Sequence, residues 1–255
     1  MTCPRFYYPD QIIVGQSIEL PDRVMHHAVH VLRLEKGDKV ILFNGKGGEF
    51  SAFIECISKT TVLVLTEKYF AIERESPLQI TLAQSICTSV KMDLIVRKTV
   101  ELGVSNIQPI AAERSLVKLS IERTTKRVWH WQQIAISACE QCGRNRVPQV
   151  LPPIPLSTWL DRQIITQKEW SNKTHKNLFF MLSPIAEKGL RDFSKVLSIT
   201  DLTLLVGPEG GFTLEEDTIA LIAGFYPLRL GARTLRTESA ALAAIAALQS
   251  LWGDY

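Results

Sequence analysis

The chain has 255 residues, of which 46% are hydrophobic and 22% are charged, and its formal net charge is +3. This composition excludes an intrinsically disordered chain and supplies enough apolar residues for a sizeable core. The longest purely apolar run, residues 240–248, is far shorter than the roughly 20 residues that a membrane-spanning helix needs, so we expect no membrane helix.

The first ten residues lack the apolar stretch of a secretory signal, which predicts a cytoplasmic protein whose five cysteines are thiols. Positive charge is concentrated in the middle of the chain, since residues 86–150 hold ten Lys and Arg against five Asp and Glu. Residues 1–75 hold nine against ten, and residues 151–255 hold ten against eleven. A polyanion would be held by the middle segment, and an ordinary solvated surface is the alternative.

Residues 1–74 predict a small β-rich domain, with short strands at 39–43 and 49–54 on either side of a turn-rich segment. A polar segment at 72–77 follows, and beyond it longer helical patterns alternate with apolar runs at 178–182, 202–206 and 228–230. Buried parallel strands are typical of such alternation. Residues 75–255 therefore predict a second domain of the α/β class.

Three helices are indicated in this second domain. Apolar residues recur at helical spacing in 92–102 and in 128–142, which predicts two amphipathic helices. Residues 240–248 are apolar on nearly every side, which predicts a buried helix. Packing inside its own domain is one explanation for that helix, and a subunit interface is the other.

A glycine-rich loop follows the apolar run at 202–206. Gly207, Gly210 and Gly211 permit backbone conformations and a close ligand approach that a Cβ would obstruct. Thr213 and Glu216 then form a capping-box pattern, so a helix is expected to begin directly after the loop. The loop lacks the Lys-Ser/Thr pair of a phosphate-binding P-loop.

Glu209 places a carboxylate within this loop, which would repel a phosphate and tolerate a cationic ligand such as a sulfonium. That charge favours an adenosyl sulfonium over a nucleotide phosphate. A tight structural turn without a ligand explains the glycines equally well.

A second loop precedes the apolar helix at 240–248. We expect Thr237 to cap this helix and Glu238 to favour the positive end of its dipole. Arg233 and Arg236 are suited to phosphates or to a developing anion. The alternative is an ordinary capped helix with solvated arginines.

Together the two loops resemble the SPOUT-class ribosomal RNA uridine-N3 methyltransferases, often called the RsmE family. The motifs are Gly-Pro-Glu-Gly-Gly at 207–211 and Leu-Gly-x-Arg-x-Leu-Arg-Thr-Glu at 230–238. The resemblance extends along nearly the whole chain and includes residues 27–33, 101–104 and 138–144. Ser239 stands where many members carry threonine.

The resemblance implies a PUA-like β-barrel RNA-binding domain at 1–74 and a SPOUT methyltransferase domain with a deep trefoil knot at 75–255. It also implies a homodimer whose three loops hold S-adenosyl-L-methionine in each subunit. The residues expected to bind this cofactor are Leu182, Ser183, Pro184, Gly207, Pro208, Glu209, Gly210, Gly211, Leu230, Gly231, Leu235, Arg236 and Thr237.

The implied reaction is methylation of N3 of a specific uridine in 16S ribosomal RNA of the small ribosomal subunit. As catalytic residues we expect Arg236, which would stabilise negative charge on the uracil ring, and Glu238, which would accept the proton or orient Arg236. A purely helix-end role for Glu238 is the alternative. The candidate RNA contacts are Arg5, His27, Arg33, Lys91, Lys98, Arg144 and Arg146, and solvated surface charge is the alternative for each.

No metal site is expected. Cys139 and Cys142 have zinc-like spacing but lie within a helix and lack a second ligand pair. His26, His27 and His30 lack a completing Cys or acid, so RNA contact or surface placement is favoured. Two other functions remain open: a SPOUT methyltransferase acting on another RNA atom or on tRNA, and a non-catalytic ribosome-binding factor.

Overall fold

The computed structural model describes residues 3–115, 121–170, 176–193 and 199–255. The chain divides into two compact units. The first unit comprises the residues up to Glu75 together with Ile136–Val147, and the second comprises Ser76–Ala135 and Pro148–Tyr255. This division differs from the single boundary expected after residue 74, because the helix α3 (Ile121–Cys142) begins in the second unit and ends in the first.

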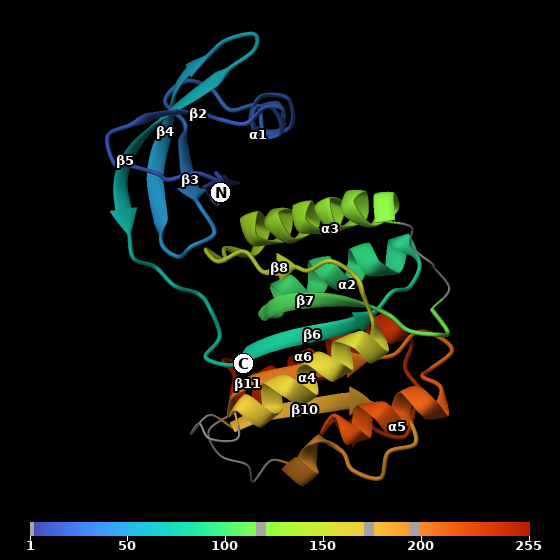
Figure 1. Ribbon diagram of the computed structural model, residues 1–255. Coiled ribbons are helices and arrows are strands. Elements are labelled where there is room, and N and C mark those ends of the chain that lie inside the picture. The colour runs from blue at the N-terminus through green and yellow to red at the C-terminus, as the bar shows by residue number, and fades with distance from the viewer. Residues whose placement is uncertain (1–2, 116–120, 171–175, 194–198) are drawn as a thin grey trace. The chain divides into compact units, whose positions relative to one another are not determined.

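The first unit is built on a five-stranded sheet in the order β1-β3-β4-β5-β2 (Figure 1). The pair β1 and β3 is parallel, and the other pairs are antiparallel. The strands expected at 39–43 and 49–54 are confirmed as β3 and β4. The elements are β1 (Arg5–Tyr7), β2 (Ser17–Glu19), α1 (Asp22–His26), the π-helical turn η1 (His27–Val31), β3 (Lys39–Phe43), β4 (Glu49–Ile57) and β5 (Val62–Phe70).

Alternation of apolar and polar residues positions this sheet over its own core. On β4 and β5 every second residue points inward, and Ala52, Ile54, Val62 and Val64 are fully buried. They pack with further apolar side chains, including Phe6, into one cluster. The first unit therefore has a hydrophobic core of its own.

The second unit contains a seven-stranded sheet whose main path has the order β12-β10-β11-β6-β7-β8, with β9 also paired to β7. All of its strand pairs are parallel, as the apolar runs in the sequence predict. Its strands are β6 (Gln79–Ser85), β7 (Val104–Ala111), β8 (Gln149–Val150), β9 (Ile154–Pro155), β10 (Lys176–Leu182), β11 (Ile199–Val206) and β12 (Tyr226–Leu228).

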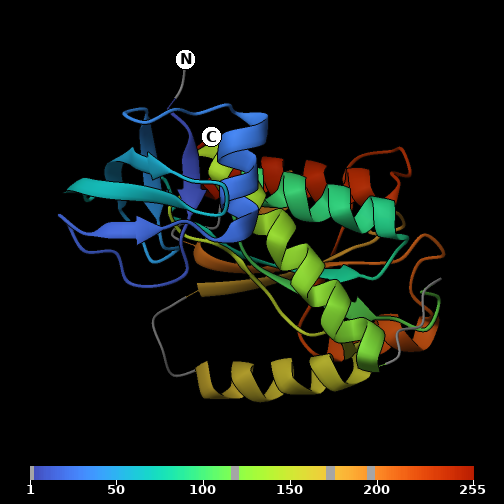
Figure 2. The ribbon, with the colours of Figure 1, turned by 90° about the horizontal axis from the view of Figure 1, so that it is seen from above.

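Helices cover both faces of this sheet (Figure 2). The helices α2 (Ser89–Glu101) and α6 (Thr237–Trp252) pack together on one face, and α4 (Leu156–Trp170) lies on the other face, where it packs with α5 (Leu214–Ile222). A single-turn helix, η2 (Leu190–Phe193), follows β10. These layers form the α/β architecture expected from the sequence.

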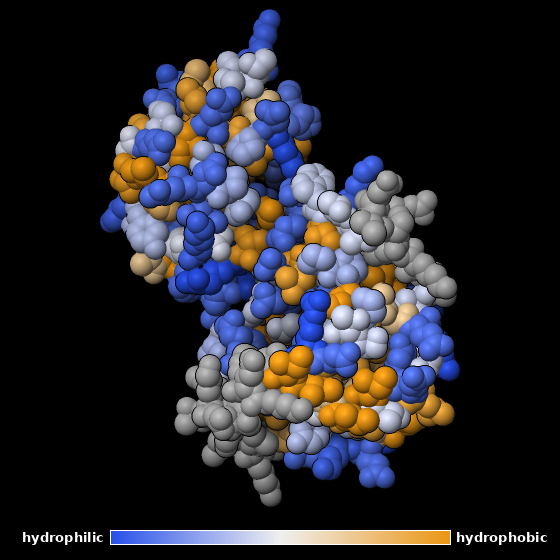
Figure 3. Space-filling view, viewed as in Figure 1, coloured by the Kyte–Doolittle hydropathy of each residue, from blue (hydrophilic) through white to orange (hydrophobic). Residues whose placement is uncertain are grey.

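Two helical faces of the second unit retain exposed apolar side chains. The face seen in Figure 3 shows hydrophobic residues over α4 and α5, where Ile165, Leu221 and Ile222 are exposed. On α6, Ala243 and Leu251 are exposed, so packing inside its own domain does not account for the whole apolar surface of this helix. None of the described helices combines the length and apolar character that a bilayer crossing requires.

Candidate functional site

A cavity of about 350 Å³ lies at the carboxyl ends of three neighbouring strands of the second unit. The strands β12, β10 and β11 are parallel neighbours, so the segments that follow Leu182, Val206 and Leu228 leave the sheet at the same edge. Open parallel sheets bind their ligands at this edge. The two glycine-bearing loops, residues 207–211 and 230–237, thus share one cavity, as the sequence predicts.

Of the residues expected to bind a cofactor, all but Gly210 line this cavity. Gly210 lies in the loop, but its carbonyl oxygen accepts a hydrogen bond of 3.0 Å from Arg114. Other residues line the cavity without having been expected there. They are Val206, Phe212, Asp217, Leu228, Arg229 and Ala240, whereas Arg233 and Thr234 belong to the expected loop at 230–237.

Two glycines of the loops adopt backbone conformations that other residues rarely adopt. Gly211 has φ of 67° and Gly231 has φ of 95°, both in the left-handed region. A Cβ added at either position would meet no protein atom within 4 Å. These two positions therefore keep open space along the cavity wall.

The exit of the first loop is fixed by the capping box that the sequence predicts. Thr213 Oγ1 accepts from the Glu216 amide at 3.2 Å, and the Thr213 amide donates to Glu216 Oε2 at 3.0 Å. The Arg114 guanidinium also donates to the carbonyl oxygen of Phe212 at 3.2 Å. The loop is therefore held by its own helix and by the segment after β7.

The expected capping role of Thr237 is wrong. Arg236 occupies the cap position without a side-chain hydrogen bond, and Thr237 is the first residue of α6. The Thr237 hydroxyl instead donates to the carbonyl oxygen of Gly207 at 2.8 Å and accepts from Gln84 Nε2 at 3.0 Å. The Thr237 hydroxyl therefore bonds to residues distant in the sequence, whereas the local pattern predicts that it caps the helix.

The charge of Glu209 is paired, which the sequence argument did not include. Lys91 Nζ lies 2.8 Å from Glu209 Oε1 and 3.6 Å from Glu238 Oε2. Burial is the largest single influence and would raise the pKa of Glu209, but the hydrogen bonds from Lys91 and from the backbone, together with the charge of Lys91, lower the pKa overall. Lys91 therefore pairs with carboxylates beside the cavity, and the RNA contact expected for it stays a prediction.

Glu238 does not line the cavity, although it was expected to be catalytic. Its side chain is 15% exposed, and Oε2 has no hydrogen-bond partner within the described residues. Arg236, the other residue expected to be catalytic, does line the cavity. The geometry therefore favours Arg236 for contact with a substrate over Glu238.

Opposite charges line the cavity from two different segments. Glu209 and Asp217 supply carboxylates, whereas Arg229, Arg233 and Arg236 supply guanidinium groups. Burial and the neighbouring charge of Glu216 raise the pKa of Asp217, and Arg114 partly offsets this shift. Asp217 follows the predicted cap Thr213 by one helical turn, and this spacing was the signal that could have identified it.

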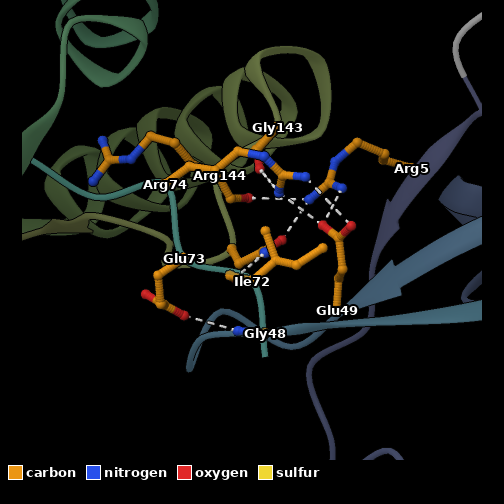
Figure 4. Close-up of polar contacts among 9 residues, drawn as sticks. Arg5, Gly48, Glu49, Ile72, Glu73, Arg74, Gly143 and Arg144 are labelled. Carbon is orange, nitrogen blue, oxygen red and sulfur yellow. Dashed lines mark hydrogen bonds and ion pairs between the residues drawn. The ribbon is translucent and has the colours of Figure 1, made fainter. Parts of the chain in front are cut away.

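Two of the expected RNA contacts lie in a buried polar cluster of the first unit (Figure 4). Arg5 donates to Glu49 Oε2 at 2.6 Å and Arg74 donates to the same oxygen at 2.8 Å. Arg144 pairs with Glu75 through a hydrogen bond of 3.0 Å, and only 6% of its side chain is exposed. Because their guanidinium groups are buried and already paired, the expectation that Arg5 and Arg144 contact RNA is corrected.

The remaining candidates for RNA contact are accessible. His27 and Arg33 are exposed on the first unit, where the Arg33 backbone has φ of 55°. Arg146 is exposed and pairs with Glu73 at 2.8 Å. Lys98 is exposed on α2 and pairs with Glu101 at 2.8 Å.

The cysteine and histidine patterns do not form a metal centre within the described ranges. No three His, Cys, Asp or Glu side chains come together there in a suitable arrangement. Cys139 is fully buried, and burial raises the pKa of its thiol to about 12. The rings of His26 and His30 lie against each other at an interplanar angle of 49°, with centroids 4.7 Å apart.

Two family models match the chain. The model described as an RNA methyltransferase domain matches residues 74–249. The model described as an RNA methyltransferase PUA domain matches residues 20–67.

Curated relatives and solved structures are similar over nearly the full chain. A ribosomal RNA small subunit methyltransferase E of Buchnera aphidicola (subsp. Acyrthosiphon pisum) is 34% identical, over 99% of this chain and 95% of the relative. A ribosomal RNA small subunit methyltransferase E from Neisseria gonorrhoeae, crystallised with S-adenosyl methionine, is 41% identical with a TM-score of 0.87. A Legionella pneumophila protein solved with bound SAM is 38% identical with a TM-score of 0.90. Both structures match 100% of each chain.

Proposed function

Because the chain belongs to the RNA methyltransferase family that includes the ribosomal RNA small subunit methyltransferases E, we propose that it methylates 16S ribosomal RNA. S-adenosyl-L-methionine is the donor, and N3 of a specific uridine in the small ribosomal subunit is the acceptor. The single observation that carries the proposal is the cavity shared by the loops at 207–211 and 230–237.

The cavity fits this donor in size and in chemistry. Its volume of about 350 Å³ lies within the range of small-molecule sites. The open space beside Gly211 and Gly231 admits a ligand close to the backbone. Asp217 supplies a carboxylate that suits the cationic part of the ligand, and the leucines Leu182, Leu228 and Leu235 supply an apolar wall.

The cofactor supplies an electrophilic methyl group when it is bound, so the chain's contribution is placement and charge stabilisation. Uracil N3 becomes nucleophilic only when its proton leaves, which puts negative charge on the ring. Arg236 lines the cavity, and its guanidinium has no partner within the described residues, so it is available to stabilise that charge. Because N3 lies on the Watson–Crick edge, the target base must be unpaired or extruded before it reacts.

Ribosomal RNA is held, in this proposal, by the first unit and by the exposed basic residues of both units. The match of residues 20–67 to a PUA domain of RNA methyltransferases supports this assignment, as does the exposure of His27, Arg33, Lys98 and Arg146. The first unit is proposed to be a PUA-like barrel, and the second to be a SPOUT domain with a trefoil knot. The strand order that puts β10 between β11 and β12 supports the second assignment.

The proposed function is tested by two measurements on the full-length protein. Calorimetry should show that it binds S-adenosyl-L-methionine with one site per chain. Incubation with small ribosomal subunits from cells that lack this methylation should then create one new stop for reverse transcriptase, because a methyl group at N3 blocks base pairing. Methylation of a ribose hydroxyl or of tRNA in the same assay would contradict the N3 assignment, and absence of cofactor binding would contradict the enzymatic function.

We also propose that the protein is a homodimer in the cytoplasm, where its ribosomal substrate resides. The packed helices α2 and α6 carry exposed apolar residues, among them Val90 at 81%, Leu94 at 37% and Leu251 at 39% exposure. Such a face on two adjacent helices is suited to a symmetric contact with a second copy.

Replacing Leu94 with glutamate is therefore expected to convert the dimer into a monomer, as measured by light scattering at micromolar concentration. The matched control is Ile222→Glu, which places the same charge on α5 at a position that is 72% exposed. If the control dissociates the dimer and Leu94→Glu does not, then α4 and α5 form the interface.

A further inference from the structure

The segment that joins β6 to α2 contacts both cavity loops, although none of its residues lines the cavity. It begins at Gln84, next to the last residue of β6, and ends at Lys91, in the first turn of α2. Lys91 pairs with carboxylates of both the loop at 207–211 and the start of α6, whereas Gln84 contacts Thr237 at the start of α6, and the Thr237 hydroxyl in turn contacts that loop. One contact is neutral and buried, and the other is ionic and half-buried.

The buried contact passes through a single hydroxyl group. Gln84 is fully buried, and its Nε2 donates to Thr237 Oγ1 at 3.0 Å. A hydroxyl has one proton, and the Thr237 proton is directed to the carbonyl oxygen of Gly207 at 2.8 Å. The Gln84 amide therefore orients a hydroxyl that joins the two loops.

The ionic contact involves residues that are close in sequence to those of the buried contact. Glu209 is two residues beyond Gly207, and Glu238 directly follows Thr237. Lys91 Nζ lies between these carboxylates, 2.8 Å from one and 3.6 Å from the other. The hydrogen bond to Glu209 raises the pKa of Lys91, so the amine keeps its charge at neutral pH.

We propose that Gln84 and Lys91 are positioning residues that set the spacing of the two loops and thereby the affinity for the methyl donor. This inference rests on the proposed function, since it assigns the residues to the same cofactor site. The loops follow different strands, β11 and β12. Contacts that already hold the two loops together reduce the conformational entropy that is lost when a ligand binds between them.

The ionic contact is tested with Lys91→Met, which keeps much of the side-chain volume. Exposed and half-buried ion pairs contribute modestly, so the dissociation constant for S-adenosyl-L-methionine is expected to rise about three- to tenfold by calorimetry. The Michaelis constant for the donor should rise by the same factor, with that for the ribosomal subunit unchanged. Lys91→Arg should restore most of the affinity.

The matched control for Lys91→Met is Glu101→Gln, which removes another ion pair of the same helix, that between Lys98 and Glu101 at 2.8 Å. It should leave donor affinity unchanged. The ratio between the affinities of the wild type and of Lys91→Met should also shrink at about 1 M salt, where charges are strongly screened. A general loss of stability would not produce this salt dependence.

The buried contact is tested with Gln84→Leu against Gln108→Leu. Gln108 is also a buried glutamine on the neighbouring strand, but its Nε2 donates only to the carbonyl oxygens of Pro109 and Pro152. Donor affinity should fall about tenfold in the first variant and stay unchanged in the second. Since Gln84→Leu can also prevent folding, Thr237→Val is compared with Thr237→Ser, which keeps the hydroxyl and should keep the affinity.

The outcomes separate the two proposals. If the wild type does not bind S-adenosyl-L-methionine, the proposed function fails. If the wild type binds and Lys91→Met and Thr237→Val bind equally well, only the positioning roles fail. Equal losses in Glu101→Gln and Lys91→Met would also overturn the inference, because they would indicate a general effect of α2.

Discussion

Replacing Arg236 with alanine is expected to lower kcat for methyl transfer by about 10²–10³-fold, the usual effect of removing one group that stabilises a developing anion. Arg236 lines the cavity and has no partner within the described residues, so its charge is available to a deprotonated uracil. The measurement is single-turnover transfer of labelled methyl groups to small ribosomal subunits at saturating donor.

Cofactor affinity must be measured separately for this variant. Calorimetry of Arg236→Ala should show a change in donor affinity far smaller than the loss of kcat, because the charge acts on the acceptor. Arg97→Ala, which removes an exposed arginine on α2, is the control and should retain full turnover. Unchanged turnover in Arg236→Ala would reject the catalytic role.

Replacing Glu49 with glutamine is expected to destabilise the first unit by about 3 kcal/mol, because it leaves two guanidinium groups without their counter-charge. Only 6% of the Glu49 side chain is exposed, and it accepts hydrogen bonds from Arg5 and Arg74. All five tryptophans lie outside the first unit, so their fluorescence would not report this loss. Hydrogen exchange of the β4 amides is the suitable measurement.

Glu67→Gln is the matched control, since Glu67 is exposed on the adjacent strand β5. It should leave the exchange rates of β4 within experimental error of the wild type. Equal protection of β4 in Glu49→Gln and in the wild type would show that the buried cluster contributes no net stability.

The same cluster predicts a defined response to acid. Burial alone would raise the pKa of Glu49, but hydrogen bonds from Arg74, Arg5 and Asn145 hold it at about 2, against 4.5 for an unperturbed carboxyl. The stabilisation is therefore complete above about pH 4.5 and is lost as the pH falls towards 2. The difference in β4 protection between the wild type and Glu49→Gln should shrink over this range, and a constant difference would contradict the depressed pKa.

Local patterns predicted much of the second unit. The capping box of Thr213 and Glu216 involves residues three positions apart, so its chemistry is visible in the sequence and is confirmed. The apolar runs at 178–182 and 202–206 correspond to β10 and β11 for the same reason. Both cofactor loops were found because each follows such a strand.

Contacts between distant residues could not be predicted in this way. Arg5 reaches Glu49 and Asn145, which are 44 and 140 positions away, so its burial depends on the completed fold. Lys91 has the spacing of a surface residue, yet it pairs with Glu209 across 118 positions. Thr237 fits a helix cap locally, but the contacts with Gln84 and Gly207 decide where its hydroxyl points.

The return of the chain to the first unit at residues 136–147 limits how the protein can be dissected. A fragment that ends at Glu75 would lack Asn145, Arg144 and Arg146, which are partners of Arg5, Glu75 and Glu73 respectively. A shortened protein that starts at Ser76 would contain these three residues but would lack their partners Arg5, Glu75 and Glu73. Neither half is therefore a suitable isolated reagent, and RNA-binding studies of the amino-terminal region require a version in which residues 136–147 are joined back to it.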